Sequence, residues 1–256
     1  MTKYFNLNAA GSSIKCKLCA NDPRAVRNLV VYGHGFGGHK ETAAADRFAA
    51  RYLAGHQDGA VLAFDWPCHG EDQKGTLRLA DCSSYLNTVI RCARERLQAE
   101  ELYAYATSFG GYLFLKYIRE EGNPFQRIAL RCPAVNMAEV LWNSIMDLES
   151  RAELERGRTA LVGFDRKLRI SPAFVDSLRS TDLTKLDYTP FREDLLILHG
   201  TEDEIVPPGA VRAFCEANGL ALVEVPGADH RFLAPGTMRY AIDSILAFFD
   251  GDTGKA

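Results

Sequence analysis

The sequence lacks an uninterrupted apolar run long enough to span a bilayer, and its opening residues, MTKYFNLNAAGSS, lack the apolar core of a signal peptide. A large charge of either sign is missing too, because the formal net charge of the 256 residues is only -3 at pH 7. We therefore expect a cytoplasmic protein that has neither a membrane nor nucleic acid as a partner.

A cysteine framework is also missing. The seven cysteines are scattered along the chain, and only Cys16 and Cys19 form a loose pair. Since no second pair follows at the spacing of a metal site, we expect reduced thiols and no bound metal. A metal half-site at Cys16 and Cys19 is the alternative that the spacing leaves open.

What the sequence does contain is a regular alternation of short apolar runs and amphipathic stretches, which is typical of parallel βαβ units. With 47% hydrophobic residues, the chain can bury a sizeable core as a single domain over residues 1–256. The expected strands lie near KYFNLN, SIKCKLCA, NLVVYGHG, AVLAFDW, LYAYATS, RIALRCPA, DLLILHG and LALVEVPG. We predict an α/β fold with a mostly parallel, twisted sheet of about eight strands and helices on both faces.

The alternation stops after the sixth expected strand, over residues 134–190, where the sequence is helical and charged without an evident strand. Such an insertion is typical of a small helical cap, or lid, rather than of a second domain. Its basic residues suit a carboxylate-bearing substrate but are more typical of a solvated helix face. Apolar cap residues that are candidates for a substrate pocket, or for ordinary packing, are Trp142, Ile145, Met146 and Leu148.

Three reactive side chains follow expected strands. Ser108 follows the fifth strand, Asp203 the seventh and His230 the eighth. In open α/β sheets, ligands bind at the carboxyl ends of the strands, so these side chains are expected at one edge. Their chain order, Ser then Asp then His, is one of the recurring orders of the catalytic triad. The alternative for Ser108 is an N-terminal cap of the following helix.

These residues resemble the α/β-hydrolase superfamily, and the resemblance covers nearly the whole chain. The nucleophile elbow of the family, G-x-S-x-G, corresponds to the run from Ala106 to Gly110, with alanine in place of the first glycine. Alanine is the next smallest residue, so the tight turn tolerates it. The family pattern HGTxDxxVP matches HGTEDEIVP and selects Asp203 over Glu202 and Glu204, and PGADHRF matches the histidine loop.

The resemblance implies a role for each residue. Ser108 is the nucleophile, His230 is the general base, and Asp203 holds the imidazole in the correct tautomer. The oxyanion hole of the family uses two backbone N–H groups. They correspond to Phe109, directly after the nucleophile, and Phe36, in the loop after the third strand.

Five further residues are expected to support this site. His34 and His199 stand where the family commonly has structural histidines that bond to loop backbone. Asp65, in FDWPCHGED, matches an acid that braces the loops near the site. Gly35 and Gly37 allow the loop backbone to approach a ligand closely.

Cofactor sites find little support in the sequence. The glycine-rich run GHGFGGHKE is compatible with phosphate binding in general, but it fits neither the dinucleotide fingerprint nor the P-loop. The histidines form no H-x-x-x-H pair with carboxylates. We expect no cofactor and no metal.

The resemblance thus implies a serine hydrolase that cleaves a small or medium carboxylic ester through an acyl-enzyme. The loop HGFGGHKE resembles that of small carboxylesterases, including cinnamoyl or feruloyl esterases. The same residues serve peptide, thioester and C–C bond hydrolysis and lyase reactions, and a non-catalytic binding protein on the same scaffold is a further alternative. The expected partner is a small-molecule ester, and a homodimer stays open.

Overall fold

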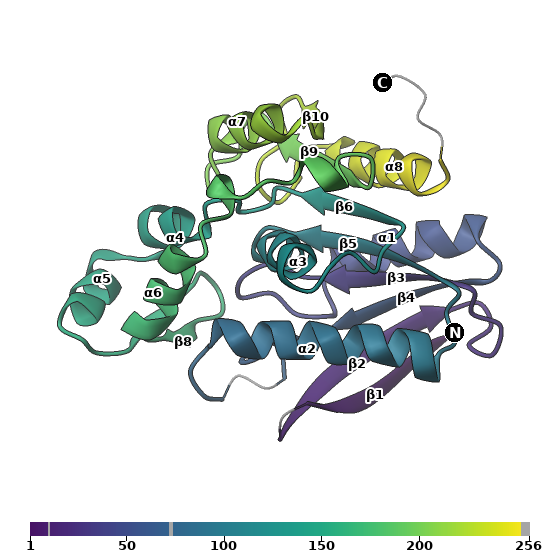
Figure 1. The fold of residues 1–256 in the computed structure, drawn as a ribbon, viewed down its shortest axis with the longest axis horizontal. Helices are drawn as coiled ribbons and strands as arrows, with labels where there is room; N and C mark the ends of the chain where they lie inside the picture. Colours follow the sequence, from purple (N-terminus) through teal and green to yellow (C-terminus); the bar gives the residue numbers. More distant parts are fainter. Residues whose placement is uncertain (10, 72–73, 252–256) are drawn as a thin grey trace.

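The computed structural model describes residues 1–9, 11–71 and 74–251, and within them eight strands form one sheet (Figure 1). Their order is β1-β2-β4-β3-β5-β6-β9-β10. β2 pairs antiparallel with β1 and β4, and the other neighbours are parallel. The strands are Thr2–Ala9 (β1), Ser12–Ala20 (β2), Asn28–Gly33 (β3), Gly59–Phe64 (β4), Glu101–Thr107 (β5), Arg127–Arg131 (β6), Leu195–Gly200 (β9) and Ala221–Val225 (β10). The predicted eight-stranded, mostly parallel sheet is confirmed.

Helices cover both faces of this sheet. Successive strand residues point to opposite faces, so Leu29 and Val31 belong to one apolar cluster while Val30 and Tyr32 belong to another. The first cluster includes residues of α2, α3 and α7, and the second includes residues of α1 and α8. The helices are Ala43–Gly55 (α1), Leu79–Arg91 (α2), Phe109–Glu120 (α3), Pro208–Asn218 (α7) and Thr237–Phe249 (α8). Burial on both faces explains why the central strands are continuous apolar runs.

The chain between β6 and β9, which we call the inserted segment, lies beyond the carboxyl ends of the central strands (Figure 1). It contains the helices Met137–Val140 (α4), Leu148–Glu155 (α5) and Pro172–Ser180 (α6) and the short helical turns Leu141–Ile145 (η2), Leu183–Lys185 (η3) and Thr189–Phe191 (η4). That this segment acts as a lid stays a prediction.

The expectation that the inserted segment contains no strand is wrong. Ala160–Val162 (β7) and Leu168–Ile170 (β8) pair antiparallel as a two-stranded hairpin. Each strand has only three residues, which is too short for a recognisable alternation. The turn between them begins at Gly163, whose φ of 137° suits glycine.

None of the helices in the described residues is both long and apolar enough to cross a membrane. The parallel strands β3, β5, β6 and β9 bring their carboxyl ends to one edge of the sheet. The loops that leave this edge carry the reactive side chains that the sequence singles out.

Candidate active site

Ser108 occupies the sharp turn between β5 and α3. Its backbone angles, φ 53° and ψ -119°, lie in a region that non-glycine residues rarely adopt. Its N–H donates to the carbonyl of Arg131 at 3.0 Å, which ties the turn to the end of β6. The hydroxyl makes no capping hydrogen bond to α3. Ser108 is therefore not a side-chain cap of α3. A strained serine between strand and helix is the geometry of a nucleophile elbow.

Ala106 fits the elbow because a glycine lies opposite it. The two residues Gly33 and Ala106 are paired in register on β3 and β5. A Cβ added to Gly33 would lie 3.4 Å from the Ala106 Cβ and 2.7 Å from a ring carbon of Phe114. On the other side of the nucleophile, a Cβ on Gly110 would lie 2.6 Å from the carbonyl oxygens of Gly33 and His34. The small residues at 33 and 110 thus provide the space that the turn requires.

Asp203 lies in the loop after β9 and is almost fully buried. Its Oδ1 accepts the backbone N–H groups of Ile205 at 2.9 Å and Val206 at 2.8 Å, while its Oδ2 lies 2.8 Å from His230 Nδ1. Burial opposes ionisation of this carboxyl, but the hydrogen bond from His230 and the further donors outweigh it and lower the pKa of Asp203. The flanking residues Glu202 and Glu204 are exposed. Of the three acids, the structure brings only Asp203 to the histidine.

His230 follows β10, and its side chain is 15% exposed. Because the Asp203 carboxylate is ionised, His230 Nδ1 carries the proton of their hydrogen bond, and Nε2 keeps its lone pair. Among the described residues, no hydrogen bond joins His230 to the Ser108 hydroxyl. In free enzymes this contact is often long and shortens only when substrate binds. The imidazole is therefore oriented and has the tautomer that a general base needs.

Two backbone N–H groups are the predicted oxyanion donors. Phe109 begins α3, and Phe36 lies in the loop after β3; neither N–H donates to any other described residue. A Cβ on Gly35 would lie 3.1 Å from the Ser108 Cβ, so this loop passes directly beside the nucleophile. The rings of Phe36 and Phe109 pack edge to face with centroids 5.7 Å apart. This packing couples the two segments that carry the predicted oxyanion donors.

Two buried histidines hold loop backbone. His34 Nδ1 lies 2.8 Å from the Gly35 carbonyl, and its Nε2 accepts the N–H of Trp66 at 3.2 Å. Burial lowers the pKa of His34 to about 3, so it stays neutral. His199 Nε2 donates to the carbonyl of Val206 at 3.0 Å, and burial lowers its pKa as well. Both histidines thus have the contacts that their predicted supporting roles require.

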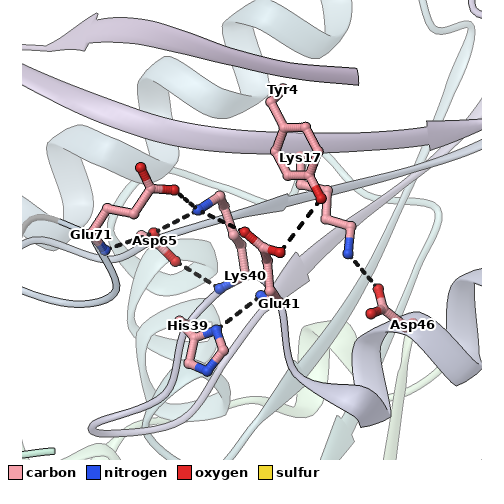
Figure 2. A network of polar contacts seen from close by, with 8 residues as sticks. All are labelled: Tyr4, Lys17, His39, Lys40, Glu41, Asp46, Asp65 and Glu71. Carbon is pink, nitrogen blue, oxygen red and sulfur yellow. Dashed lines mark hydrogen bonds and ion pairs between the residues drawn. The ribbon is translucent and has the colours of Figure 1, made fainter. Parts of the chain in front are cut away.

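Asp65 is the acceptor at the centre of a polar network that holds the other end of the Phe36 loop (Figure 2). It accepts the backbone N–H of Lys40 at 2.6 Å and the Lys40 ammonium at 3.2 Å. The same ammonium is paired with Glu71 and, at 3.5 Å, with Glu41. Gly37, between the two fixed ends of the loop, has a φ of 72°. The loop is anchored at His34 and at Lys40, and glycines lie in between.

Comparison with known proteins identifies the family. A sequence model described as "Alpha/beta hydrolase family" matches residues 29–237. The chain belongs to the alpha/beta hydrolase family. A search of curated proteins gave no match.

Solved structures share its fold at low sequence identity. Est1E from Butyrivibrio proteoclasticus, solved with bound ferulic acid, is 18% identical with a TM-score of 0.77, and the match covers 98% of this chain and 100% of that chain. XC6422 from Xanthomonas campestris, described as a serine hydrolase without a lid, is 18% identical with a TM-score of 0.63 over 98% and 93% of the two chains. Mouse alpha/beta hydrolase domain-containing protein 10 is 14% identical with a TM-score of 0.70 over 98% and 100%.

Sequence reasoning missed two residues of this hydrolase that touch the candidate triad, Arg131 and Cys132. Arg131 donates to the His230 carbonyl, and the Cys132 thiol lies within 4.8 Å of the Asp203 carboxylate. A signal was present, because RIALRCPA places an arginine at the end of an otherwise apolar central strand. The thiol, the carboxylate and the His230 imidazole lie within 4.8 Å of one another and could together ligate a metal. Burial raises the pKa of the Cys132 thiol, however, which favours the protonated thiol over the thiolate that binds metals.

The apolar residues predicted for a substrate pocket of this hydrolase separate in the structure. Trp142 lines a cavity of about 630 Å³ between α4, α6 and α7, which no candidate triad residue lines. Ile145 and Met146 are buried in the core, and Leu148 is 81% exposed. Neither Cys16 nor Cys19 forms a disulfide within the described residues. Leu148 does not line this cavity, and a substrate contact of the four residues stays a prediction.

Proposed function

We propose that the protein is a serine hydrolase that cleaves a small or medium carboxylic ester through an acyl-enzyme on Ser108, His230 and Asp203. The observation that carries the proposal is the 2.8 Å contact of His230 Nδ1 with Asp203 Oδ2. It orients an imidazole whose Nε2 is left to accept a proton. The strained turn at Ser108 supports the same assignment, as do the N–H groups of Phe36 and Phe109, which donate to no other described residue.

The reaction follows from these groups. The Ser108 oxygen attacks the ester carbonyl carbon while its proton moves to His230 Nε2, and the carbonyl oxygen becomes an oxyanion that accepts the N–H groups of Phe36 and Phe109. Collapse breaks the bond to the alcohol, which takes the proton from His230. A water then repeats the attack on the acyl-enzyme and releases the carboxylic acid. Side chains, backbone and water suffice for every step.

A carboxylic ester is favoured as the substrate by the loop around Phe36 and by its surroundings. The loop around Phe36 resembles that of small esterases, and Est1E, a protein of the same fold, was solved with ferulic acid. The hairpin of the inserted segment lies close to this loop, since a Cβ on Gly37 would be 3.1 Å from the Arg166 carbonyl oxygen. A bulky group on the side of Gly37 would meet this hairpin, which favours small or medium substrates.

Matched butyryl substrates test the bond type. We would measure hydrolysis of p-nitrophenyl butyrate, a butyryl thioester and a butyryl anilide by wild type, Ser108→Ala and His230→Ala. We expect the ester to be cleaved fastest, and each substitution to lower kcat at least about 1,000-fold with the fold intact by circular dichroism. Preference for the thioester or the anilide would move the proposal to those bonds. Ester turnover by Ser108→Ala at the wild-type rate would refute the assignment of Ser108 as the nucleophile.

A further inference from the structure

Arg131 ends β6 and is buried, with 7% of its surface exposed. A guanidinium keeps its charge in proteins, and burying a charge is costly unless partners compensate it. None of the ion pairs among the described residues includes Arg131, so no carboxylate within 4.0 Å offsets the charge. A buried cation without an acidic partner requires an explanation from its other contacts.

Those contacts hold the loop that carries His230. The Arg131 Nη1 donates to the His230 carbonyl at 2.8 Å, and the guanidinium lies 5.0 Å from the centroid of the Phe232 ring. The Nε also lies 3.4 Å from the Tyr105 hydroxyl. Phe232 has a φ of 58°, which is uncommon for a bulky residue and indicates a loop held in a strained conformation. One side chain thus fixes the loop at two positions, residues 230 and 232.

The backbone at this point reaches the other two members of the candidate triad. The carbonyl of Arg131 accepts the N–H of Ser108 at 3.0 Å. The next residue, Cys132, has a φ of 48°, and its N–H donates to the carbonyl of Leu198 at 2.8 Å. Its thiol lies within 4.8 Å of the Asp203 carboxylate. The dipeptide at the end of β6 therefore contacts the serine, the histidine and the aspartate.

We propose that Arg131 is the positioning residue that sets the His230 imidazole relative to the Ser108 elbow. The inference rests on the proposed function, because it assigns a role within that triad. Arg131 joins the two sides directly: its backbone holds the serine turn, and its guanidinium holds the histidine loop. A planar guanidinium can donate to the carbonyl and stack on Phe232 at the same time, which a lysine ammonium cannot do in the same geometry.

Arg127 provides a matched control on the same strand. It also donates from Nη1 to a carbonyl, that of Phe248, and its guanidinium lies 5.2 Å from the centroid of the Phe248 ring. It stands at the opposite end of β6, where its contacts are with the last turn of α8 rather than with the triad. If such an arginine had a purely structural role, its replacement would have the same effects at both ends of the strand.

The first measurement compares Arg131→Met, Arg131→Lys and Arg127→Met in p-nitrophenyl butyrate hydrolysis and thermal unfolding. We expect Arg131→Met to lower kcat about 10- to 100-fold with KM within about twofold, because a misplacement of about 1 Å costs rates of this order. Arg131→Lys should recover part of kcat, and Arg127→Met should keep kcat within about twofold. If Arg131→Met and Arg127→Met both lose thermal stability but keep wild-type kcat, Arg131 is structural only and the proposal is overturned.

A second measurement does not depend on turnover. The proton between His230 Nδ1 and Asp203 gives a far-downfield proton resonance, assigned by its loss in His230→Ala. We expect this resonance to shift or broaden in Arg131→Met and to be unchanged in Arg127→Met. If the resonance changes in Arg131→Met but neither wild type nor any variant hydrolyses the ester, the proposed function is refuted and the positioning role of Arg131 still holds. If Arg131→Met does not fold, Arg131→Lys decides: wild-type kcat with an unchanged resonance contradicts the proposal.

Discussion

Replacing Asp203 with Asn should inactivate the protein by reversing a single hydrogen bond. In the structure, Oδ1 accepts two backbone N–H groups at 2.9 and 2.8 Å, so the oxygen of the new amide must take that position. The amide NH₂ then faces His230 Nδ1, 2.8 Å away, where the carboxylate accepted a proton. His230 must accept there instead, which places its own proton on Nε2 and removes the general base.

The expected loss is about 10,000-fold in kcat, which is typical of a triad whose histidine is held in the wrong tautomer. The fold should survive, because the two backbone bonds remain. The new NH₂ also faces His199 Nε2, a donor 3.3 Å from Oδ2, so we expect a cost of about 1–3 kcal/mol in the free energy of unfolding. The assay is p-nitrophenyl butyrate hydrolysis with urea unfolding. Glu202→Gln, at the exposed neighbour, is the control and should be fully active.

Wild-type-like kcat in Asp203→Asn would refute the tautomer argument. If Glu202→Gln were inactive and Asp203→Asn active, the triad acid would be Glu202 and the assignment of Asp203 would be wrong. Either result is separable from unfolding, since the urea curves report the fold independently.

Three further predictions concern stability. Gly110→Ala should fail to fold or lose activity, because its Cβ would lie 2.6 Å from two carbonyl oxygens. Gly209→Ala in α7, whose Cβ would have nothing within 4 Å, should be stabilised by about 0.5–1 kcal/mol in thermal unfolding. Equal effects of the two substitutions would contradict the steric argument. Lys40→Met should lower the free energy of unfolding by about 3–5 kcal/mol because it leaves a buried carboxylate without its cation, and a loss under 1 kcal/mol in urea would argue against this. Burial lowers the pKa values of His34 and His69 to about 3, so between about pH 6.5 and 3 the unfolded chain binds more protons than the folded one. As the pH is lowered through this range, the free energy of unfolding should therefore decrease by about 1.4 kcal/mol per pH unit for each histidine. The measurement is urea unfolding of wild type and His69→Phe at several pH values. An equal dependence of the free energy of unfolding on pH in the two proteins would contradict the prediction.

The sheet and its order along the chain could be predicted because parallel strands buried on both faces leave continuous apolar runs in the sequence. The elbow around Ser108 could be predicted because its small neighbours are dictated by sterics, and Ala106 is tolerated because Gly33 lies opposite. That compensation was not predictable, since it depends on which strands pair and in which register.

The hairpin β7–β8 and the contacts of Arg131 escaped prediction for a related reason. Three-residue strands show no alternation, and they are specified by a glycine turn and by their pairing. Arg131 and His230 are far apart in the chain, so the sequence shows an arginine in an apolar strand without showing the carbonyl that accepts from it. Local patterns predict elements, while contacts between distant loops require the fold.

The most direct test of the central claim is covalent labelling of wild type, Ser108→Ala and His230→Ala with a fluorophosphonate, with mass spectrometry to locate the adduct. We predict a single adduct on Ser108 in wild type, none in Ser108→Ala, and strongly slowed labelling in His230→Ala. No adduct in wild type, or an equal rate of labelling in Ser108→Ala, would contradict the assignment of Ser108 as an activated nucleophile.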